Sequence, residues 1–452
     1  MDPLEGTMAG DRISEQTVST KLRRIAELAK EHPDRVFISL AHHIDIDWLK
    51  EAHRRVRKGG APGIDRQTAS DYAVDLEGNL RSLLERFKSG RYRAPPVRRV
   101  YIPKGDGKEM RPLGIPTFED KVLQRAVHML LEAIYEQDFM PCSFGFRPGR
   151  SAHDALAALW EQTMKMSGCW LVEVDLRKYF DTVDHRHLRE ILSQRVRDGV
   201  LIRAIGKWLN AGIMEESRLW RPETGTPQGG VISPLLANVY LHEVLDVWFE
   251  REVKPRLQGR GFLIRYADDF VMGFEHEEDA RRVLASLPQR LERFGLVIHP
   301  TKTRLIDFRR PRGGGPQGSS FDFLSFTHFW GKSRKGQMVI RRKTASKRLT
   351  RAMKAIHQWC RAHRHLKVRQ QHAMLVKKLD GHDQYFSLPG NYRALALLRR
   401  AVTRCWRYWL ARRAQRRSMP WPRFLRLLAR YPIPNPKPTY LGSRRPVANP
   451  CS

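Results

Sequence analysis

The sequence lacks the features of a disulfide-bonded, zinc-bound or membrane protein. It contains no C-x-x-C pair, which argues against a disulfide framework and against a structural zinc site. It also contains no apolar run of about 18 residues, and its first ten residues include no apolar signal segment. We therefore expect a globular protein of a reducing compartment that does not cross a membrane. The cysteines are Cys142, Cys169, Cys360, Cys405 and Cys451.

Acidic residues are almost missing from residues 331–452. This segment holds 31 lysines and arginines against only Asp380 and Asp383, a net charge of +29 out of +34 for the whole chain. Residues 1–330 therefore carry only +5. A charge run is usually a solvated face, but a segment of this length with so few acids favours a polyphosphate partner. We expect the protein to bind nucleic acid.

Composition changes divide the chain into four segments. Residues 1–60 are polar with helical periodicity and end in a glycine- and proline-rich loop, and residues 61–330 mix strand-like and helical runs. Residues 331–440 become basic and, after about residue 340, helical, and residues 441–452 form a tail. At 452 residues and 41% apolar content, the chain is long enough for two or three domains. The strand-like runs lie at 97–103, 170–176, 262–266 and 321–326.

A helix is predicted over the basic stretch that follows residue 390. Apolar residues recur there at alternating spacings of three and four, which predicts a buried face, and most of the arginines fall on other faces. Trp406 and Trp409 are interpreted as core residues before they are interpreted as stacking platforms for bases. The apolar positions are Leu395, Leu398, Val402, Cys405 and Trp409.

Three carboxylates stand out within apolar surroundings. A buried, unpaired carboxylate costs several kcal/mol, so Asp268 and Asp269 in F-L-I-R-Y-A-D-D-F-V-M must lie in a solvated turn or meet cations. A plain hairpin turn is one interpretation, and Asp175 at the end of another strand-like run can be a simple cap. Together the three acids favour a second interpretation, in which carboxylates hold divalent ions for in-line phosphoryl transfer.

The stretch G-T-P-Q-G-G at residues 225–230, which we name the glycine turn, precedes an apolar run predicted to be a helix. Its glycines allow the backbone to approach a ligand closely. A plain loop before a buried helix is the alternative.

In their order along the chain, these motifs and several others resemble those of reverse transcriptases encoded within group II introns. Each stretch is weak evidence alone, but the ordered set is specific and covers nearly the whole chain. The matching stretches are G-A-P-G-I-D (60–65), Y-I-P-K-G-D-G-K-E-M-R-P-L-G-I-P-T (101–117), S-F-G-F-R-P-G-R-S-A-H-D-A (143–155), D-L-R-K-Y-F-D (175–181), T-P-Q-G-G-V-I-S-P-L-L-A-N (226–238), Y-A-D-D-F (266–270), F-G-L-V-I-H-P-T-K-T (294–303) and F-D-F-L-S-F (321–326).

The resemblance implies an α+β fold with the fingers, palm and thumb of a right-hand polymerase. Residues 1–60 would be an N-terminal helical extension, residues 61–330 the fingers and the palm with its antiparallel sheet, and residues 331–440 a basic helical thumb or maturase domain. Members of the family often end in a DNA-binding and HNH-type endonuclease segment, for which residues 441–452 are too short. The resemblance therefore implies a reverse transcriptase-maturase without its own endonuclease, which leaves the source of its primer open; a nascent strand at a replication fork is one source.

The resemblance also assigns roles to site residues. Asp175, Asp268 and Asp269 would be the catalytic acids and would hold two Mg²⁺ ions, for which Mn²⁺ could substitute. The backbone carbonyl of Leu176 would be a further metal ligand. The ring of Phe180 would crowd a ribose 2′-OH, so that deoxynucleotides enter and ribonucleotides are rejected.

Four more residues would bind the nucleotide. Lys104 and Arg111 would grip the triphosphate, and Gln228 in the glycine turn would line the nucleotide pocket. Lys302 would donate a proton to the pyrophosphate leaving group, although an ordinary surface lysine is the alternative.

The function implied is RNA-directed DNA polymerisation combined with maturase activity, in which the protein binds its group II intron RNA, assists its splicing and supports its mobility. The partners would be the intron RNA, a DNA target and primer, and deoxynucleoside triphosphates, in a nucleoid-associated ribonucleoprotein of the bacterial cytoplasm. A domesticated polymerase of the same family, active in defence or repair, and a non-enzymatic splicing factor are the alternatives. The RNA contacts are expected at Arg400, Arg404, Arg407, Arg412 and Arg413.

Overall fold

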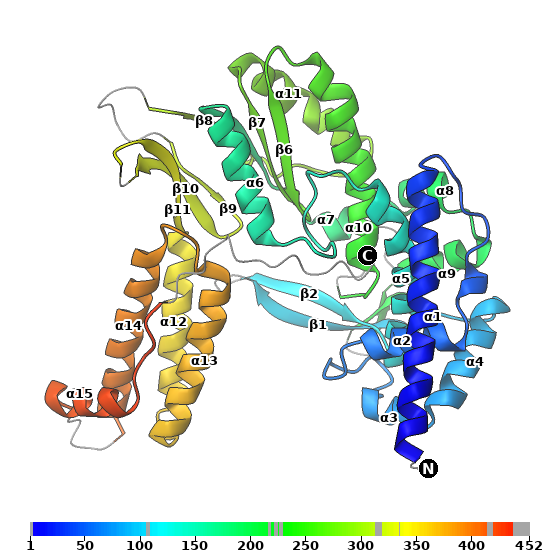
Figure 1. Cartoon of the computed structure of the whole chain (residues 1–452), viewed down its shortest axis with the longest axis horizontal. Helices are drawn as coiled ribbons and strands as arrows, with labels where there is room; N and C mark the ends of the chain where they lie inside the picture. Colours follow the sequence, from blue (N-terminus) through cyan, green and yellow to red (C-terminus); the bar gives the residue numbers. More distant parts are fainter. Residues whose placement is uncertain are drawn as a thin grey trace. The chain divides into compact units, whose positions relative to one another are not determined.

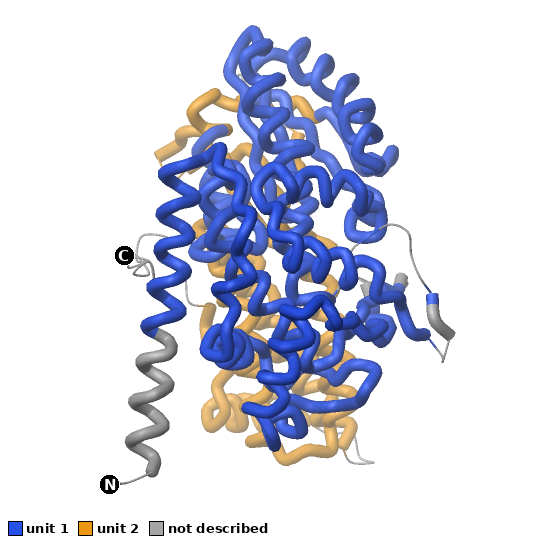
Figure 2. Tube along the Cα trace, turned by 90° about the vertical axis from the view of Figure 1, so that its right-hand side faces the viewer, with its two compact units in different colours: residues 1–162, 169–305, 449–452 blue, residues 163–168, 306–448 orange. Residues whose placement is uncertain are grey.

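The computed structural model divides the chain into two compact units, coloured separately in Figure 2. The first unit comprises residues 1–162, 169–305 and 449–452, and the second comprises residues 163–168 and 306–448. The main boundary thus follows Leu305, earlier in the chain than the change of composition at residue 331. The structure describes residues 3–104, 109–215, 218–220, 225, 229–311, 319–333, 335–413 and 419–436.

Helices packed around α5 (Phe118–Asp138) make up much of the first unit. This helix begins after Thr117, whose side chain accepts a hydrogen bond from the backbone N–H of Asp120, and most of its residues are buried. The long helix α1 (Pro3–Glu31), blue in Figure 1, and α2 (Ile46–Arg55) both pack against it. The segment before residue 60 therefore shares the core of the first unit. The other helices up to residue 292 are α3 (Ala69–Ala73), α4 (Leu76–Lys88), α6 (Ala152–Lys165), α7 (Tyr179–Thr182), α8 (His185–Arg195), α9 (Gly199–Leu209), α10 (Ser233–Leu241) and α11 (Glu277–Glu292).

A small sheet begins with the hairpin of β1 (Val97–Lys104) and β2 (Glu109–Ile115). The strand β4 (Ile213–Glu215) pairs parallel to β1 and antiparallel to β5 (Arg218–Trp220), which gives the order β2-β1-β4-β5. Figure 1 shows the β1–β2 hairpin in cyan. This hairpin carries the segment expected to meet the triphosphate.

Three antiparallel strands form the second sheet region of the first unit. The strand β7 (Asp269–Phe274) lies between β6 (Gly261–Tyr266) and β3 (Gly168–Val174). All three are largely buried, as expected for strands that are apolar along most of their length. The expected strands at 170–176 and 262–266 are thus present, although β3 ends one residue before Asp175.

Within its described residues, the second unit combines an antiparallel sheet, in the order β11-β10-β9, with the helices α12 to α15. The single strand expected at 321–326 is wrong, because Leu324 and Ser325 have φ angles of +46° and +70° and break it into two strands. The expectation of helix from about residue 340 is also wrong at its start, since β11 occupies the first positions. The elements are β9 (Phe321–Phe323), β10 (Phe326–Lys332), β11 (Met338–Thr344), α12 (Ser346–Ala362), α13 (Val368–Phe386), α14 (Tyr392–Ala411) and α15 (Trp421–Arg430), preceded by β8 (Arg304–Arg309).

The helices of the second unit share one apolar core. Trp406 is completely buried, as expected, whereas Cys405 and Trp409 are only half-buried at its edge. The buried stripe of α14 therefore shifts from the predicted Cys405 and Trp409 to Trp406 and Leu410.

The α+β class is confirmed by the antiparallel sheets and the many helices. None of the helices in the described residues has the length and apolar character needed to cross a lipid bilayer.

Candidate active site

The ends of neighbouring strands bring two of the predicted carboxylates together. Asp175 follows the last residue of β3, and Asp268 lies in the turn between β6 and β7. In the antiparallel pairing of β3 with β7, Val174 faces Phe270, so the chain leaves β3 beside the β6–β7 turn. The two acids, more than 90 residues apart in the sequence, thus belong to one site.

The electrostatics of Asp268 show that the charge of Asp175 acts on it. Burial raises the pKa of Asp268 above its ordinary value, and the negative charge of Asp175 raises it further, while Arg111 and Arg265 oppose the shift. Arg111 is exposed on β2, so its charge reaches the carboxylates from the β1–β2 hairpin. A pair of mutually repelling carboxylates is a set of hard oxygen donors that suits a divalent cation such as Mg²⁺.

The side chains alone do not supply three metal ligands at this site in the described residues. Among the described residues, no group of three or more His, Cys, Asp or Glu side chains is arranged to hold a metal ion. Asp269 is the exposed first residue of β7 and faces Tyr266 across the hairpin. Leu176 is buried, and its backbone pairs with Ile298.

Lys302 lies in this site. Its Nζ atom donates a hydrogen bond to Oδ2 of Asp175 over 2.5 Å. The segment before it is tied to the same place, because the N–H of His299 donates to the carbonyl of Asp175 and the N–H of Arg177 donates to that of Val297, each over 2.8 Å. An ammonium group therefore lies beside the carboxylate of Asp175.

Phe180 lies in the short helix α7, just after Asp175. It is half-buried and meets Tyr179 edge to face, with 5.4 Å between the ring centres. The hydroxyl of Tyr179 donates a hydrogen bond to the carbonyl of Ala237 over 2.6 Å, which fixes α7 against α10. The first residue of the glycine turn, Gly225, packs on the same helix, since a Cβ atom there would lie 3.0 Å from the carbonyl oxygen of Phe180.

Two predicted nucleotide-binding residues are described only in part or not at all. The backbone of Lys104 faces Glu109 across the β1–β2 hairpin, two positions from the pair formed by Ile102 and Arg111. The side chain of Lys104 and the whole of Gln228 lie outside the described residues.

The β6–β7 turn has a buried support that the sequence motifs did not predict. Arg265 is fully buried and donates to both carboxylate oxygens of Asp246, over 2.7 and 2.5 Å. It also donates to the carbonyl of Ala267 over 3.1 Å. Ala267 has a φ of +56°, an uncommon conformation for a residue with a Cβ, and this hydrogen bond holds it. An arginine within the apolar run F-L-I-R-Y required a buried partner, and that was the available signal.

Residues 143–145 also contact the β6–β7 turn. A Cβ atom on Gly145 would lie 2.3 Å from the backbone nitrogen of Ala267, so only glycine fits there. Asn238 donates to the carbonyl of Gly145 over 2.6 Å and accepts from Arg265 over 3.0 Å. Ser143 accepts from Arg265 over 2.8 Å. The turn that carries Asp268 is therefore fixed by a closed network.

The arginines predicted to bind RNA are not equivalent. Arg407 donates to the carbonyl of Met419 over 2.9 Å and lies 4.4 Å from the ring centre of Trp421, so part of its role is to join α14 to α15. Arg412 stacks on Tyr408 at 3.3 Å from the ring centre. The exposed ones are Arg400, Arg404 and Arg413.

Comparisons with known proteins show what this chain is similar to. Residues 102–328 match the family model described as "Reverse transcriptase (RNA-dependent DNA polymerase)". The chain is 39% identical over 247 residues to the group II intron-encoded protein LtrA of Lactococcus lactis subsp. cremoris, covering 52% of this chain and 40% of that protein. It is 36% identical over 287 residues to the protein YkfC of Escherichia coli (strain K12), covering 56% of this chain and 75% of that protein. The chain thus spans about two fifths of the length of LtrA and three quarters of that of YkfC.

Proposed function

Because this chain belongs to the reverse transcriptase (RNA-dependent DNA polymerase) family, we propose that it is itself an RNA-directed DNA polymerase built as a right hand. Residues 61–330 form the fingers and palm, residues 1–60 a helical extension and residues 331–440 the thumb or maturase domain. The observation that carries this proposal is the pairing of Asp175 with Asp268 at neighbouring strand ends, within the electrostatic reach of Arg111.

Asp175 and Asp268 would hold Mg²⁺, with Asp269 and the carbonyl of Leu176 as additional oxygen donors. The proposal includes two Mg²⁺ ions, for which Mn²⁺ could substitute. When bound, such ions supply positive charge where an in-line phosphoryl transfer develops negative charge. The buried network around Arg265 and Gly145 supports this role, since it holds Asp268 in place through the strained Ala267.

The other site residues then act on the nucleotide and the primer. Arg111 and Lys104 bind the triphosphate from the β1–β2 hairpin, and Gln228 in the glycine turn contacts the nucleotide. Phe180 crowds the 2′ position of the sugar. The primer 3′-hydroxyl gives its proton to water and its oxygen bonds to the α-phosphorus, while the bond from that phosphorus to the oxygen bridging to the β-phosphate breaks. Lys302 gives a proton to the departing pyrophosphate.

We further propose that group II intron RNA is a partner and that the protein assists its splicing and mobility. This is supported by the likeness to LtrA, whose name describes a group II intron-encoded protein, and by the charge of +29 on residues 331–452. The complex would be a ribonucleoprotein of the bacterial cytoplasm, associated with the nucleoid and its DNA targets.

Primer extension on an RNA template tests the polymerase assignment. Asp268→Asn and Asp175→Asn should each reduce the extension rate at least about a thousandfold, since several kcal/mol of charge stabilisation correspond to a factor of ten for every 1.36 kcal/mol or so. Affinity for intron RNA should change little, because that affinity depends mainly on the basic segment.

Asp34→Asn is the matched control, because Asp34 is an exposed acid of the first unit outside the site. Extension by either site variant at nearly the wild-type rate in Mg²⁺ would contradict the assignment. If the wild-type protein bound intron RNA and promoted splicing without any extension, the non-enzymatic splicing factor would replace the polymerase.

A further inference from the structure

The two described ends of the glycine turn are held by side chains from different helices. At its start, the N–H of Gly225 donates to the carbonyl of Val183 over 2.8 Å. The carbonyl of Gly225 accepts a hydrogen bond from Nε2 of His185 over 2.6 Å. His185 is the buried first residue of α8. The entry to the turn is therefore fixed from the α7–α8 side.

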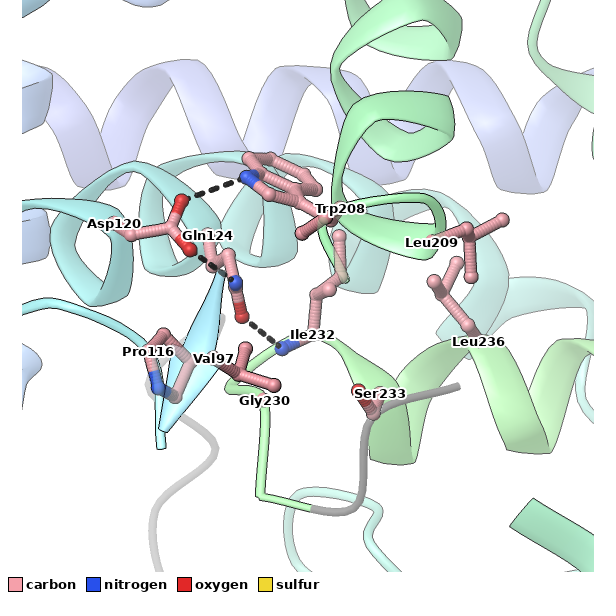
Figure 3. A pocket seen from close by; sticks show the side chains of 11 residues that line it. Val97, Pro116, Asp120, Gln124, Trp208, Leu209, Gly230, Ile232, Ser233 and Leu236 are labelled. Carbon is pink, nitrogen blue, oxygen red and sulfur yellow. Dashed lines mark hydrogen bonds between the residues drawn. The ribbon is translucent and has the colours of Figure 1, made fainter. Parts of the chain in front are cut away.

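Gln124 of α5 holds Val231 and Ile232, the two residues that directly follow the glycine turn and form its exit. Its Oε1 atom accepts hydrogen bonds from the backbone N–H groups of Val231, over 2.8 Å, and Ile232, over 3.4 Å. Figure 3 shows the bond to Ile232, and Gln124 is only 3% exposed. Ile232 is the N-cap residue of α10, and its own side chain makes no capping hydrogen bond. Gln124 thus satisfies N–H groups at the start of α10 that would otherwise lack a partner in the protein interior.

The orientation of the Gln124 amide is set from behind. Its Nε2 atom donates to Oδ2 of Asp120 over 3.0 Å. Oδ1 of Asp120 accepts from the indole of Trp208 over 2.8 Å and from the hydroxyl of Tyr92. Rotating the amide would place a donor against the N–H of Val231 and an acceptor against a carboxylate. The chain of hydrogen bonds drawn in Figure 3 therefore directs the Gln124 carbonyl at the exit of the turn.

A third contact comes from the strand that carries Arg111. Gly229 has a φ of +113°, and a Cβ atom there would lie 2.6 Å from the carbonyl oxygen of Gly114 in β2. The exit of the turn therefore packs against β2 at Gly229 and is hydrogen-bonded to Gln124 through Val231 and Ile232. In the sequence, Gln228 stands between Gly225 and Gly229.

We propose that Gln124 and His185 are positioning residues that clamp the two ends of the glycine turn and thereby set the affinity for the incoming deoxynucleotide. The inference rests on the proposed contact between the turn and the nucleotide. Neither residue touches the reacting atoms, so both act through the turn. Loosening either end lets the turn move relative to β2 and Arg111, which weakens nucleotide binding more than the chemical step.

The experiment measures KM for a deoxynucleoside triphosphate and kcat on a primed RNA template with the full chain. Gln124→Met keeps the side-chain volume and removes the hydrogen bonds, and His185→Phe keeps a planar ring and removes the hydrogen bond at the entry. Each should raise KM roughly tenfold, the effect of losing one or two buried hydrogen bonds, and change kcat and primer-template affinity by less than about twofold. Gln124→Glu retains the acceptor, so its KM should fall between those of wild type and Gln124→Met.

Controls separate positioning from folding. Gln137→Met changes an exposed glutamine of the same helix and should leave KM unchanged. Because both residues act on one turn, the double variant should raise KM by less than the product of the single effects. Thermal unfolding identifies any variant that fails to fold. If either Gln124→Met or His185→Phe fails to fold, the other one tests the proposal.

Gln228→Ala distinguishes this inference from the function on which it rests. If Gln228→Ala raises KM while folded Gln124→Met and His185→Phe do not, the clamp is wrong and the nucleotide contact stands. If none of the three raises KM, the glycine turn does not bind the nucleotide and both proposals fall. Equal losses of kcat and primer-template affinity in the clamp variants, with KM unchanged, would show a purely structural role.

Discussion

At the scale of single residues, Asp120 shows how burial changes the chemistry of a carboxyl group. It is 1% exposed, and burial raises its pKa from 3.8 to about 6, although hydrogen bonds from Tyr92, Trp208 and Gln124 act in the opposite direction. The folded protein therefore keeps a proton that the unfolded chain loses between these two values. The contribution of this raised pKa to the free energy of unfolding is fully present below pH 3.8 and is lost as the pH rises through about 6.

This difference of pKa predicts how Asp120→Asn alters the pH dependence of stability. The free energy of unfolding of wild type minus that of the variant should fall by about 3 kcal/mol from below pH 4 to above pH 6, since each pKa unit corresponds to about 1.36 kcal/mol. Denaturant unfolding of both proteins over this range measures it, and other carboxyl groups cancel in the difference. A difference that stayed constant with pH would mean that Asp120 ionises normally in the folded protein.

At the scale of an element, the β6–β7 hairpin depends on a segment distant in sequence. Residues 142–144 bond to the backbone of β6, with the N–H of Phe144 donating to the carbonyl of Arg265 over 2.9 Å and the N–H of Arg265 donating to that of Cys142 over 2.8 Å. Gly145 then meets the backbone of Ala267 in the turn. The position of Asp268 is thus determined by packing at a residue that has no side chain.

Gly145→Ala should therefore reduce the proposed polymerase activity without changing either of the proposed catalytic acids. The added methyl would displace the turn, and a shift of about 1 Å at a catalytic centre can cost about a hundredfold in rate. Primer extension should fall by about that factor, while RNA binding is retained. Gly59→Ala is the control, because a Cβ atom at Gly59 meets nothing within 4 Å. Normal extension by Gly145→Ala would show that the turn adapts without moving Asp268.

At the scale of the whole molecule, charge is the property that most separates the two ends of the chain. Residues 331–452 carry +29 of the net +34. Within α14, the exposed Arg393, Arg400 and Arg404 are spaced by seven and four positions, so they share one helical face. Arg407 is already engaged with Met419 and Trp421 and is a poorer candidate than the sequence suggested.

Replacing Arg393, Arg400 and Arg404 by Gln should reduce the salt dependence of intron RNA binding. Each phosphate contact contributes a slope of about −0.7 to −0.9 in log affinity against log salt, so the slope should become shallower by about two to three. Splicing assistance should weaken more than extension on a short primed template. A titration over a salt series measures the slope, with Arg251, Arg256 and Arg281 of the first unit replaced by Gln as the charge-matched control. An unchanged slope and affinity would leave this face as solvated surface.

The sequence by itself determined the class of fold and the family, and it proposed Asp175 and Asp268 as the catalytic acids. Ordered motifs around Asp175 and Asp268 are local patterns of residue type, and local patterns are what a sequence displays directly. The strands at 97–103 and 262–266 were predictable for the same reason, because runs of apolar and β-branched residues between turn formers specify strands locally. The break at Leu324 was not, since left-handed φ angles at residues with a Cβ run against local preference.

Only the tertiary structure decided how those acids are held. The pairing of Arg265 with Asp246, the contact of Gly145 with Ala267 and the bonds from Gln124 to the exit of the glycine turn all join residues between 19 and 122 positions apart. The local pattern can mark Arg265 as buried, through its apolar run, but it does not identify the partner of any of these residues. The partner becomes visible only when folding removes both residues from water, because an unpaired polar group is then costly and a paired one fixes a single arrangement.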